Sequence, residues 1–168
     1  MQTTTRSLLI MRHAKAEAWG QTDHARRLTD RGEADAAATG RWLAETGRRP
    51  DHVLVSSSAR TLDTWEAVST AGSFQLDPEV EPGLYDASPD AVLDLVRETD
   101  ERVGILLVIG HNPTMAWLAQ MLDGGDGDPD ATAALQRGFP TSAVAAFAVP
   151  GAWRDLALGE ARLVAVHP

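Results

Sequence analysis

The sequence lacks cysteine entirely, and it also lacks long hydrophobic runs. The absence of cysteine excludes disulfides, thiolate nucleophiles and cysteine-ligated zinc, and it is consistent with a reducing compartment. The longest apolar runs, such as 105–109 and 143–149, are much shorter than the ~20 residues that span a bilayer. The apolar stretch near the N-terminus is also too short for a signal peptide. We therefore expect a cytoplasmic protein with no membrane contact.

Positive charge is scarce, because Lys15 is the only lysine and the formal net charge is -9. A surface this acidic is repelled by phosphate backbones, so we expect no sequence-independent binding to nucleic acids. The length of 168 residues matches one ordinary domain and suffices to bury a core without disulfides or metals. Hydrophobic residues at 43% and charged residues at 23% are typical of a folded chain. The sequence thus predicts a single domain over residues 1–168.

Strand-like and helix-like segments alternate along the whole chain, which is typical of an α/β layered domain. Apolar runs predict strands at 7–11, 53–55, 103–109, 142–149 and 161–167, and a weaker one at 74–76. Helical spacing predicts helices at 30–47, 59–70, 91–98 and 114–122. Residues 123–130 are expected to form a loop, and the last two strands to be joined through Pro150 and Gly151. Neither a repeat nor a domain boundary interrupts this order.

Two of the predicted helices begin at strong local signals. Thr29 is suited to cap the first helix, and the acidic residues that follow it favour the positive end of the helix dipole. The segment Ser88-Pro89-Asp90 combines a capping serine, a proline that the first turn tolerates and an acidic side chain. The run 103–109 carries a different signal: its near-continuous apolarity predicts a strand that is buried on both faces.

Basic and imidazole side chains follow three of the predicted strands, at the point where each strand ends. Arg12 and His13 come directly after the first strand, Arg60 follows the second, and His111 follows the run 103–109. Open α/β sheets bind their ligands at the carboxyl ends of their strands. Guanidinium forks match phosphate oxygens, and imidazole acts as a nucleophile or donor near neutral pH. The sequence therefore predicts a phosphate pocket at this edge.

The segments that carry these side chains resemble the histidine phosphatase superfamily. The similar segments are Arg12-His13-Ala14, 53–60 and 108–111, and each lies behind a predicted strand. Over nearly the whole chain the spacing is similar to that of the SixA-type phosphohistidine phosphatases. Further similar pieces lie around Asp23, Arg26 and Thr29, at Leu84-Tyr85-Asp86 and at Phe139-Pro140-Thr141-Ser142. The resemblance implies a three-layer α/β/α sandwich of the phosphoglycerate-mutase-like type, with a mostly parallel central sheet.

The resemblance also implies roles for the four pocket residues. His13 is expected to be the nucleophile, which takes the phosphoryl group onto a ring nitrogen and passes it to water. Arg12, Arg60 and His111 are expected to surround the phosphoryl oxygens, where charge develops during transfer. The scheme requires neither a metal nor a cofactor.

The general acid is where the sequence departs from many phosphatases of this superfamily. They carry a glutamate that protonates an alkoxide leaving group, whereas the nearest counterpart here is Asp86. A phosphorylated imidazole leaves without such help, and the SixA-type enzymes are similarly short of a strong acid. Lys15 and Asn112 lie beside the motif residues, and Arg26 lies in the loop that follows the first strand. Lys15 and Asn112 are each expected either to approach the ligand or to be ordinary surface residues. Asp23 and Arg26 are expected either to fold over the pocket or to form an ion pair within the loop.

Other features of the sequence have simpler explanations. His24, His52 and His167 have no motif around them and are expected to be surface residues. The acidic loop resembles a calcium-binding loop in the spacing of its aspartates, but Ala131 stands where glycine is needed and Arg137 where glutamate is needed. No Gly-x-Ser-x-Gly elbow and no Gly-Lys-Ser/Thr phosphate loop occurs. The sequence thus favours neither a serine hydrolase nor a nucleotide hydrolase of that type.

Three functions remain open from the sequence alone. The first is a phosphatase that removes phosphate from histidine on a protein partner. The second is a phosphatase of a small phosphorylated metabolite that uses the same His13 chemistry. The third is a phosphate-binding module without catalysis, against which the intact nucleophile counts. The short chain has no room for large capping insertions, and the open pocket that this leaves favours the protein substrate.

Overall fold

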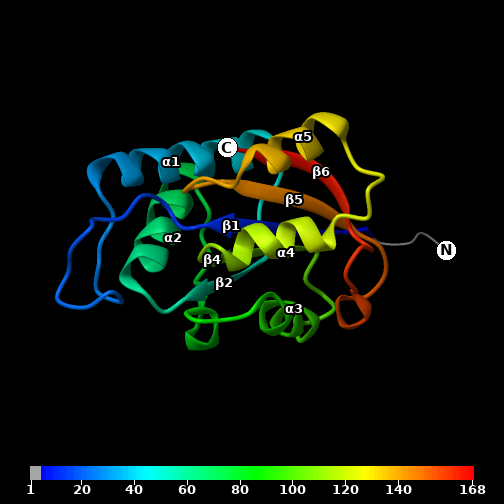
Figure 1. The fold of residues 1–168 in the computed structure, drawn as a ribbon, viewed down its shortest axis with the longest axis horizontal. Coiled ribbons are helices and arrows are strands. Elements are labelled where there is room, and N and C mark those ends of the chain that lie inside the picture. The colour runs from blue at the N-terminus through cyan, green and yellow to red at the C-terminus, as the bar shows by residue number, and fades with distance from the viewer. Residues whose placement is uncertain (1–4) are drawn as a thin grey trace.

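The computed structural model describes residues 5–168, in which a six-stranded sheet lies between two layers of helices (Figure 1). The strands are β1 (Arg6–Arg12), β2 (His52–Ser56), β3 (Glu79–Glu81), β4 (Ile105–Gly110), β5 (Val144–Val149) and β6 (Arg162–His167). The helices are α1 (Asp30–Glu45), α2 (Ala59–Gly72), α3 (Pro89–Arg97), α4 (Thr114–Leu122) and α5 (Pro129–Arg137), with short 3-10 turns η1 (Pro82–Leu84) and η2 (Trp153–Asp155). The predicted α/β sandwich is confirmed.

The sheet is parallel through four strands and antiparallel through the last two. Its order is β3-β2-β4-β1-β5-β6, and the neighbours from β3 to β1 run parallel. The carboxyl ends of β1, β2 and β4 therefore meet at one edge. In this register Arg12 is the partner of Gly110, so the residues that follow the two strands emerge side by side. The segment after β1 projects beyond this edge, at the left of Figure 1.

Each face of the sheet has its own apolar core. Helices α1 and α2 cover one face, and α3, α4 and α5 cover the other. β4 contributes to both cores, because Leu106 and Val108 point to one side whereas Leu107 and Ile109 point to the other. All four side chains are fully buried, which confirms the prediction of a strand covered on both faces.

The predicted helix starts are also confirmed. The hydroxyl of Thr29 accepts a hydrogen bond from the Gly32 amide at 2.9 Å, and that of Ser88 accepts one from the Ala91 amide at 3.2 Å. Each bond satisfies an amide that has no partner inside its helix. No helix within residues 5–168 is long and apolar enough to cross a membrane.

Three of the predicted elements need correction. The strand expected at 74–76 was wrong: Phe74 is buried and stacks on Trp65, while the strand that pairs with β2 is β3. The segment 123–130 is only partly a loop, because Asp128 caps α5, a helix that the sequence analysis did not predict. The connection between β5 and β6 extends well beyond Pro150 and Gly151 and contains η2.

Candidate active site

The four predicted pocket residues lie together at the carboxyl edge of the parallel strands. Arg12 is the last residue of β1 and His13 follows it, while His111 follows β4. Arg60 stands in the first turn of α2 and is only 6% exposed. The imidazole rings of His13 and His111 are 5.3 Å apart between centroids. The fold thus brings together two imidazoles and two guanidiniums.

The His13 ring is fixed in one tautomer by its neighbour. Nδ1 lies 2.7 Å from the carbonyl oxygen of Ala14. A carbonyl oxygen only accepts hydrogen bonds, so Nδ1 carries the hydrogen and Nε2 keeps its lone pair. Burial, together with the charges of Arg60 and Arg12, lowers the pKa of His13 to about 4. The hydrogen bond to Ala14 acts in the opposite direction and raises this pKa, but its effect is smaller than that of burial. At neutral pH this ring is uncharged, and Nε2 is available as a nucleophile.

The His111 ring is held by the strand next to its own. Its Nε2 lies 2.8 Å from the hydroxyl oxygen of Ser56, the last residue of β2. Burial, followed by the proximity of His13 and Arg60, lowers the pKa of His111 to about 3. His111 is therefore neutral near pH 7, a form in which it donates one hydrogen bond without adding charge.

Both arginines present donors that the protein itself does not satisfy. Nη1 of Arg12 donates to the carbonyl oxygen of Phe139 at 3.3 Å. Both terminal nitrogens of Arg60 donate to Asp23, Nη1 to its carbonyl at 2.8 Å and Nη2 to its carboxylate at 3.1 Å. The Nε atoms of both arginines are buried and have no hydrogen-bond partner in the described structure. An unpaired buried donor is costly, and both of these belong to the side chains that bring positive charge to the pocket.

Asp23 joins the pocket to the loop that follows β1. Its carboxylate accepts hydrogen bonds from Arg60, from Nε of Arg26 at 3.0 Å and from the hydroxyl of Tyr85. These hydrogen bonds hold the pKa of Asp23 well below its usual range. The bond from Tyr85 has the largest effect, followed by the bond from Arg26 and by the charge and bond of Arg60. Arg26 also donates to the carbonyl of Glu17 at 2.8 Å. Arg26 is therefore a member of this network and ties Asp23 to the loop that follows β1.

The remaining candidates lie around the pocket in different ways. The side chain of Lys15 is exposed, while its carbonyl oxygen accepts a hydrogen bond from the amide of Thr29, the α1 cap. Asn112 donates to the Phe139 carbonyl at 2.8 Å and accepts from the first turn of α4, so its amide links these two segments beside the pocket. Asp86 is exposed, and its carboxylate has no hydrogen bond or ion pair to any described residue.

Four residues that the sequence analysis did not assign to the pocket contribute to it. Ser56 holds His111, and the ring of Tyr85 meets that of His111 edge to face at 5.5 Å. His24 is exposed as predicted, but its ring packs against Tyr85 at 5.0 Å and bonds to the Ser57 hydroxyl at 2.9 Å. A lone histidine without a motif gives no signal in the sequence. The serines of the run 56–58 are conspicuous in the sequence. In the structure Ser56 and Ser57 bond to the rings of His111 and His24, and Ser58 caps α2.

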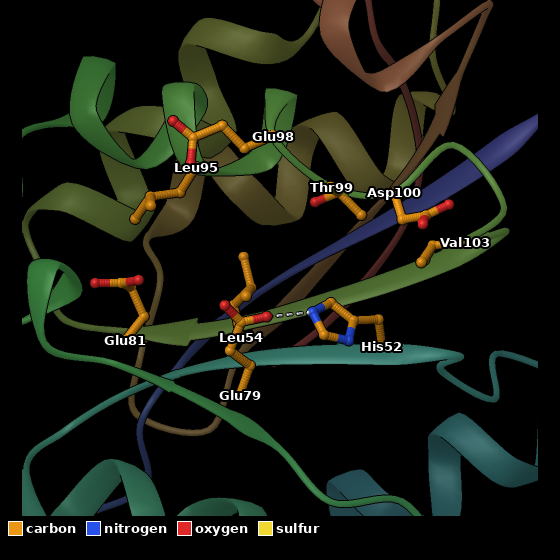
Figure 2. A pocket seen from close by; sticks show the side chains of 9 residues that line it. All are labelled: His52, Leu54, Glu79, Glu81, Leu95, Glu98, Thr99, Asp100 and Val103. Atoms are coloured by element: carbon orange, nitrogen blue, oxygen red, sulfur yellow. Dashed lines mark hydrogen bonds and ion pairs between the residues drawn. The ribbon is translucent and has the colours of Figure 1, made fainter.

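A separate hollow of about 310 Å³ lies between β2, β3 and α3, and none of these rings lines it (Figure 2). Its polar lining is mostly acidic and includes Glu79, Glu81, Glu98 and Asp100. The one imidazole there, His52, is paired with Glu79 at 2.9 Å. Such a lining repels phosphate, in contrast to the pocket around His13. Within residues 5–168 no cluster of three or more histidines and carboxylates is arranged to hold a metal.

Comparison with known families gives the same assignment as the geometry. The model of the histidine phosphatase superfamily (branch 1) matches residues 8–103, more than half of the chain. The chain belongs to the histidine phosphatase superfamily. It is accordingly an enzyme, a phosphatase of the hydrolase class.

Within the histidine phosphatases, the SixA proteins are close relatives. A solved structure from Nakamurella multipartitia that is described as a SixA phosphohistidine phosphatase superposes with a TM-score of 0.86 and 32% identity, over 98% of this chain and 96% of that one. The protein histidine phosphatase SixA complexed with tungstate gives 0.78 and 26%, over 95% of both chains. The phosphohistidine phosphatase SixA of Escherichia coli K12 is 29% identical over 82% of both chains. This histidine phosphatase is thus SixA-like over nearly its whole length.

Proposed function

We propose that this histidine phosphatase removes the phosphoryl group from phosphohistidine on a protein partner, through a covalent intermediate on Nε2 of His13. The observation that carries the proposal is the state of that nitrogen. Nδ1 is committed to the Ala14 carbonyl, so the lone pair of Nε2 is free, and the low pKa of His13 keeps it unprotonated at neutral pH. Arg12 and Arg60 bring fixed positive charge to the same place.

The proposed reaction has two displacements at phosphorus. In the first, Nε2 of His13 forms a bond to phosphorus while the bond to the substrate's imidazole nitrogen breaks, and that imidazole takes a proton from solvent. In the second, water forms the new P–O bond, the bond to Nε2 breaks, and inorganic phosphate leaves with His13 neutral again. Arg12, Arg60 and His111 stabilise the oxygens on which charge develops.

The choice of phosphohistidine has two supports. SixA relatives carry this activity in their names, and one of them is complexed with tungstate, a tetrahedral oxyanion like phosphate. Asp86 is exposed and unbonded, so it is not held in place to protonate an alkoxide. The Asp23 carboxylate is held in place, but its hydrogen bonds keep its pKa well below the usual range, so it has no proton to give at neutral pH. An imidazole is a much better leaving group than an alkoxide, and it needs no acid of this kind.

We also propose that residues 1–168 form a single catalytic domain that acts in the cytoplasm. The two apolar cores share one sheet across residues 5–168, which supports a single unit. A pocket without a large covering insertion suits a side chain carried by another protein.

The proposal is tested by offering three substrates under identical conditions: a phosphohistidine protein, sugar phosphates and an aryl phosphate. We expect rapid turnover of the first, measurable turnover of the aryl phosphate and slow turnover of the sugars. Fast hydrolysis of a sugar phosphate would instead assign the enzyme to a small metabolite. Stoichiometric phosphate binding with no turnover of any substrate would make the pocket a binding module.

A further inference from the structure

Four aromatic rings form a series of neighbouring contacts from the nucleophile to an exposed side chain. The centroid distances are 5.3 Å from His13 to His111, 5.5 Å from His111 to Tyr85 and 5.0 Å from Tyr85 to His24. The first three residues are half-buried, and His24 is exposed. The proposed chemistry uses the inner two rings only, and it assigns no task to the outer two.

The outer two rings are nevertheless firmly held. His24 is tied at both ends, because its ring bonds to the Ser57 hydroxyl at 2.9 Å and its carbonyl accepts from the Ala59 amide at 2.9 Å. The hydroxyl of Tyr85 donates to Asp23, and the Arg60 guanidinium lies over the Tyr85 ring at 5.8 Å from the centroid. A half-buried and an exposed ring fixed in this way form a preorganised surface, which costs little entropy to use in binding.

In-line transfer determines which part of the substrate meets this surface. When Nε2 of His13 attacks phosphorus, the leaving group points away from His13. The rings farthest along the series from His13 are Tyr85 and His24. We infer that Tyr85 and His24 form a wall that recognises an aromatic leaving group, here the imidazole of phosphohistidine, and so determine specificity. This inference rests on the proposed function, because it names the part of that substrate which the wall contacts.

Aromatic recognition has a measurable signature. Aromatic rings favour edge-to-face or offset contact with each other, and such a pair is worth about 0.5–1.5 kcal/mol beyond the burial of apolar area, a factor of about 2 to 12 in affinity. An aliphatic ring of similar size buries comparable area without this term. The preference for an aromatic over an aliphatic ring therefore separates the wall from general hydrophobic binding.

The test uses phenylphosphonate and cyclohexylphosphonate, which share a phosphonate head and a six-membered ring and which are not hydrolysed at their P–C bond. Calorimetric titration gives the ratio of their dissociation constants for the unaltered protein and four variants. We expect a phenyl preference of about 3- to 10-fold that falls toward 1 in Tyr85→Leu and in His24→Leu. Tyr85→Phe keeps the ring and should keep most of the preference. His52→Leu, at the opposite end of β2, is the matched control and should leave the ratio unchanged.

The outcomes separate this inference from the proposed function. Equal binding of the two phosphonates by the unaltered protein, or a preference that survives both Tyr85→Leu and His24→Leu, would overturn the wall. His24 is exposed, so His24→Leu gives a result even where Tyr85→Leu fails to fold. A protein that prefers phenylphosphonate but hydrolyses no phosphate would support the wall and overturn the phosphatase proposal. Failure to bind either phosphonate would overturn both.

Discussion

Asp23 and Arg60 are joined by two hydrogen bonds that use both ends of the guanidinium. Nη1 donates to the Asp23 carbonyl at 2.8 Å and Nη2 to its carboxylate at 3.1 Å. The fork is therefore oriented before any phosphate arrives, with its buried Nε unpaired. Because Asp23 belongs to the loop after β1 and Arg60 to α2, this contact also fastens the loop to the body of the protein.

The shape of the Arg60 side chain should matter more than its charge. The Arg60 fork bonds to Asp23 through two separate nitrogens, whereas lysine offers a single nitrogen that cannot reproduce this planar geometry. We expect Arg60→Ala to lower kcat by about 10³-fold or more, and Arg60→Lys to restore little of it. Steady-state kinetics with an aryl phosphate measure both. Arg27→Lys, in the exposed ion pair with Asp63, is the matched control and should change kcat by less than about twofold. Full activity of Arg60→Lys would show that the planar fork of Arg60 is not needed to bind the phosphoryl group.

His13→Ala should give a folded protein with no turnover, because the other groups of the pocket cannot form the covalent intermediate. The unaltered enzyme, mixed with labelled substrate and quenched in alkali, should carry an acid-labile, alkali-stable phosphoryl group. We expect this label to be absent from His13→Ala and present in His52→Leu, which lies at the opposite end of β2 from the pocket. Label retained by His13→Ala would place the nucleophile elsewhere.

Acid should lower the activity of the enzyme only well below neutral pH. The nucleophile is the unprotonated His13 ring, and burial lowers its pKa to about 4, so in the free enzyme kcat/KM should fall as pH drops through about 4 and not through 6.5. The unfolded state binds protons at His13 and His111 from about pH 6.5 downward, so the free energy of unfolding should also decrease between pH 6.5 and 4. NMR titration of the His13 ring checks the pKa directly. A midpoint near 6.5 would contradict it.

Removing the carboxylate of Asp86 should have little effect on phosphohistidine. The side chain is exposed and unbonded, and general acid help, where present, is worth about 10²–10⁴-fold. We expect Asp86→Asn to change the phosphohistidine rate by less than about threefold, as should the control Asp90→Asn in the first turn of α3. Efficient hydrolysis of a sugar phosphate that collapses in Asp86→Asn would make Asp86 the general acid.

Chelators should leave the activity unchanged, because the proposed reaction takes all its positive charge from guanidiniums. Vanadate should inhibit by occupying the cationic pocket around His13, Arg12 and Arg60. Turnover measured after dialysis against a chelator, and inhibition measured with and without Arg60→Ala, check both statements. A loss of activity that added metal restores would show that a cation takes part.

The sequence contained the local signals of the fold, including one that was overlooked. Ser88-Pro89-Asp90 correctly predicted the start of α3, and Asp128-Pro129-Asp130 has the same capping pattern at the start of α5. The edge strand β3 gave no such signal. Its residues are exposed or half-buried and mostly acidic, and only pairing with β2 makes this segment a strand. A strand that forms only because it pairs with another strand cannot be predicted from the local sequence pattern.

The pocket was predicted as far as strand order determines it. Arg12, His13 and His111 follow from two apolar strands whose carboxyl ends meet, so sequence position suffices to bring them together. The contacts that orient these side chains could not be predicted in this way. The Phe139 carbonyl, which accepts from both Arg12 and Asn112, is a backbone atom of a distant loop and has no signature in residue type.

The pairing of β1 with β4 also bears on when the enzyme becomes active after synthesis. Arg12 and Gly110 are register partners although most of the chain lies between them, so the nucleophile and His111 meet only after this non-local parallel pairing has formed. Long-range pairing is slow compared with helix formation. A nascent or refolding chain should therefore have no phosphatase activity until this pairing has formed. A slip of β1 by one residue would turn its buried side chains to the opposite faces of the sheet. The pairing of β1 with β4, which positions the pocket, is therefore stable in only one register.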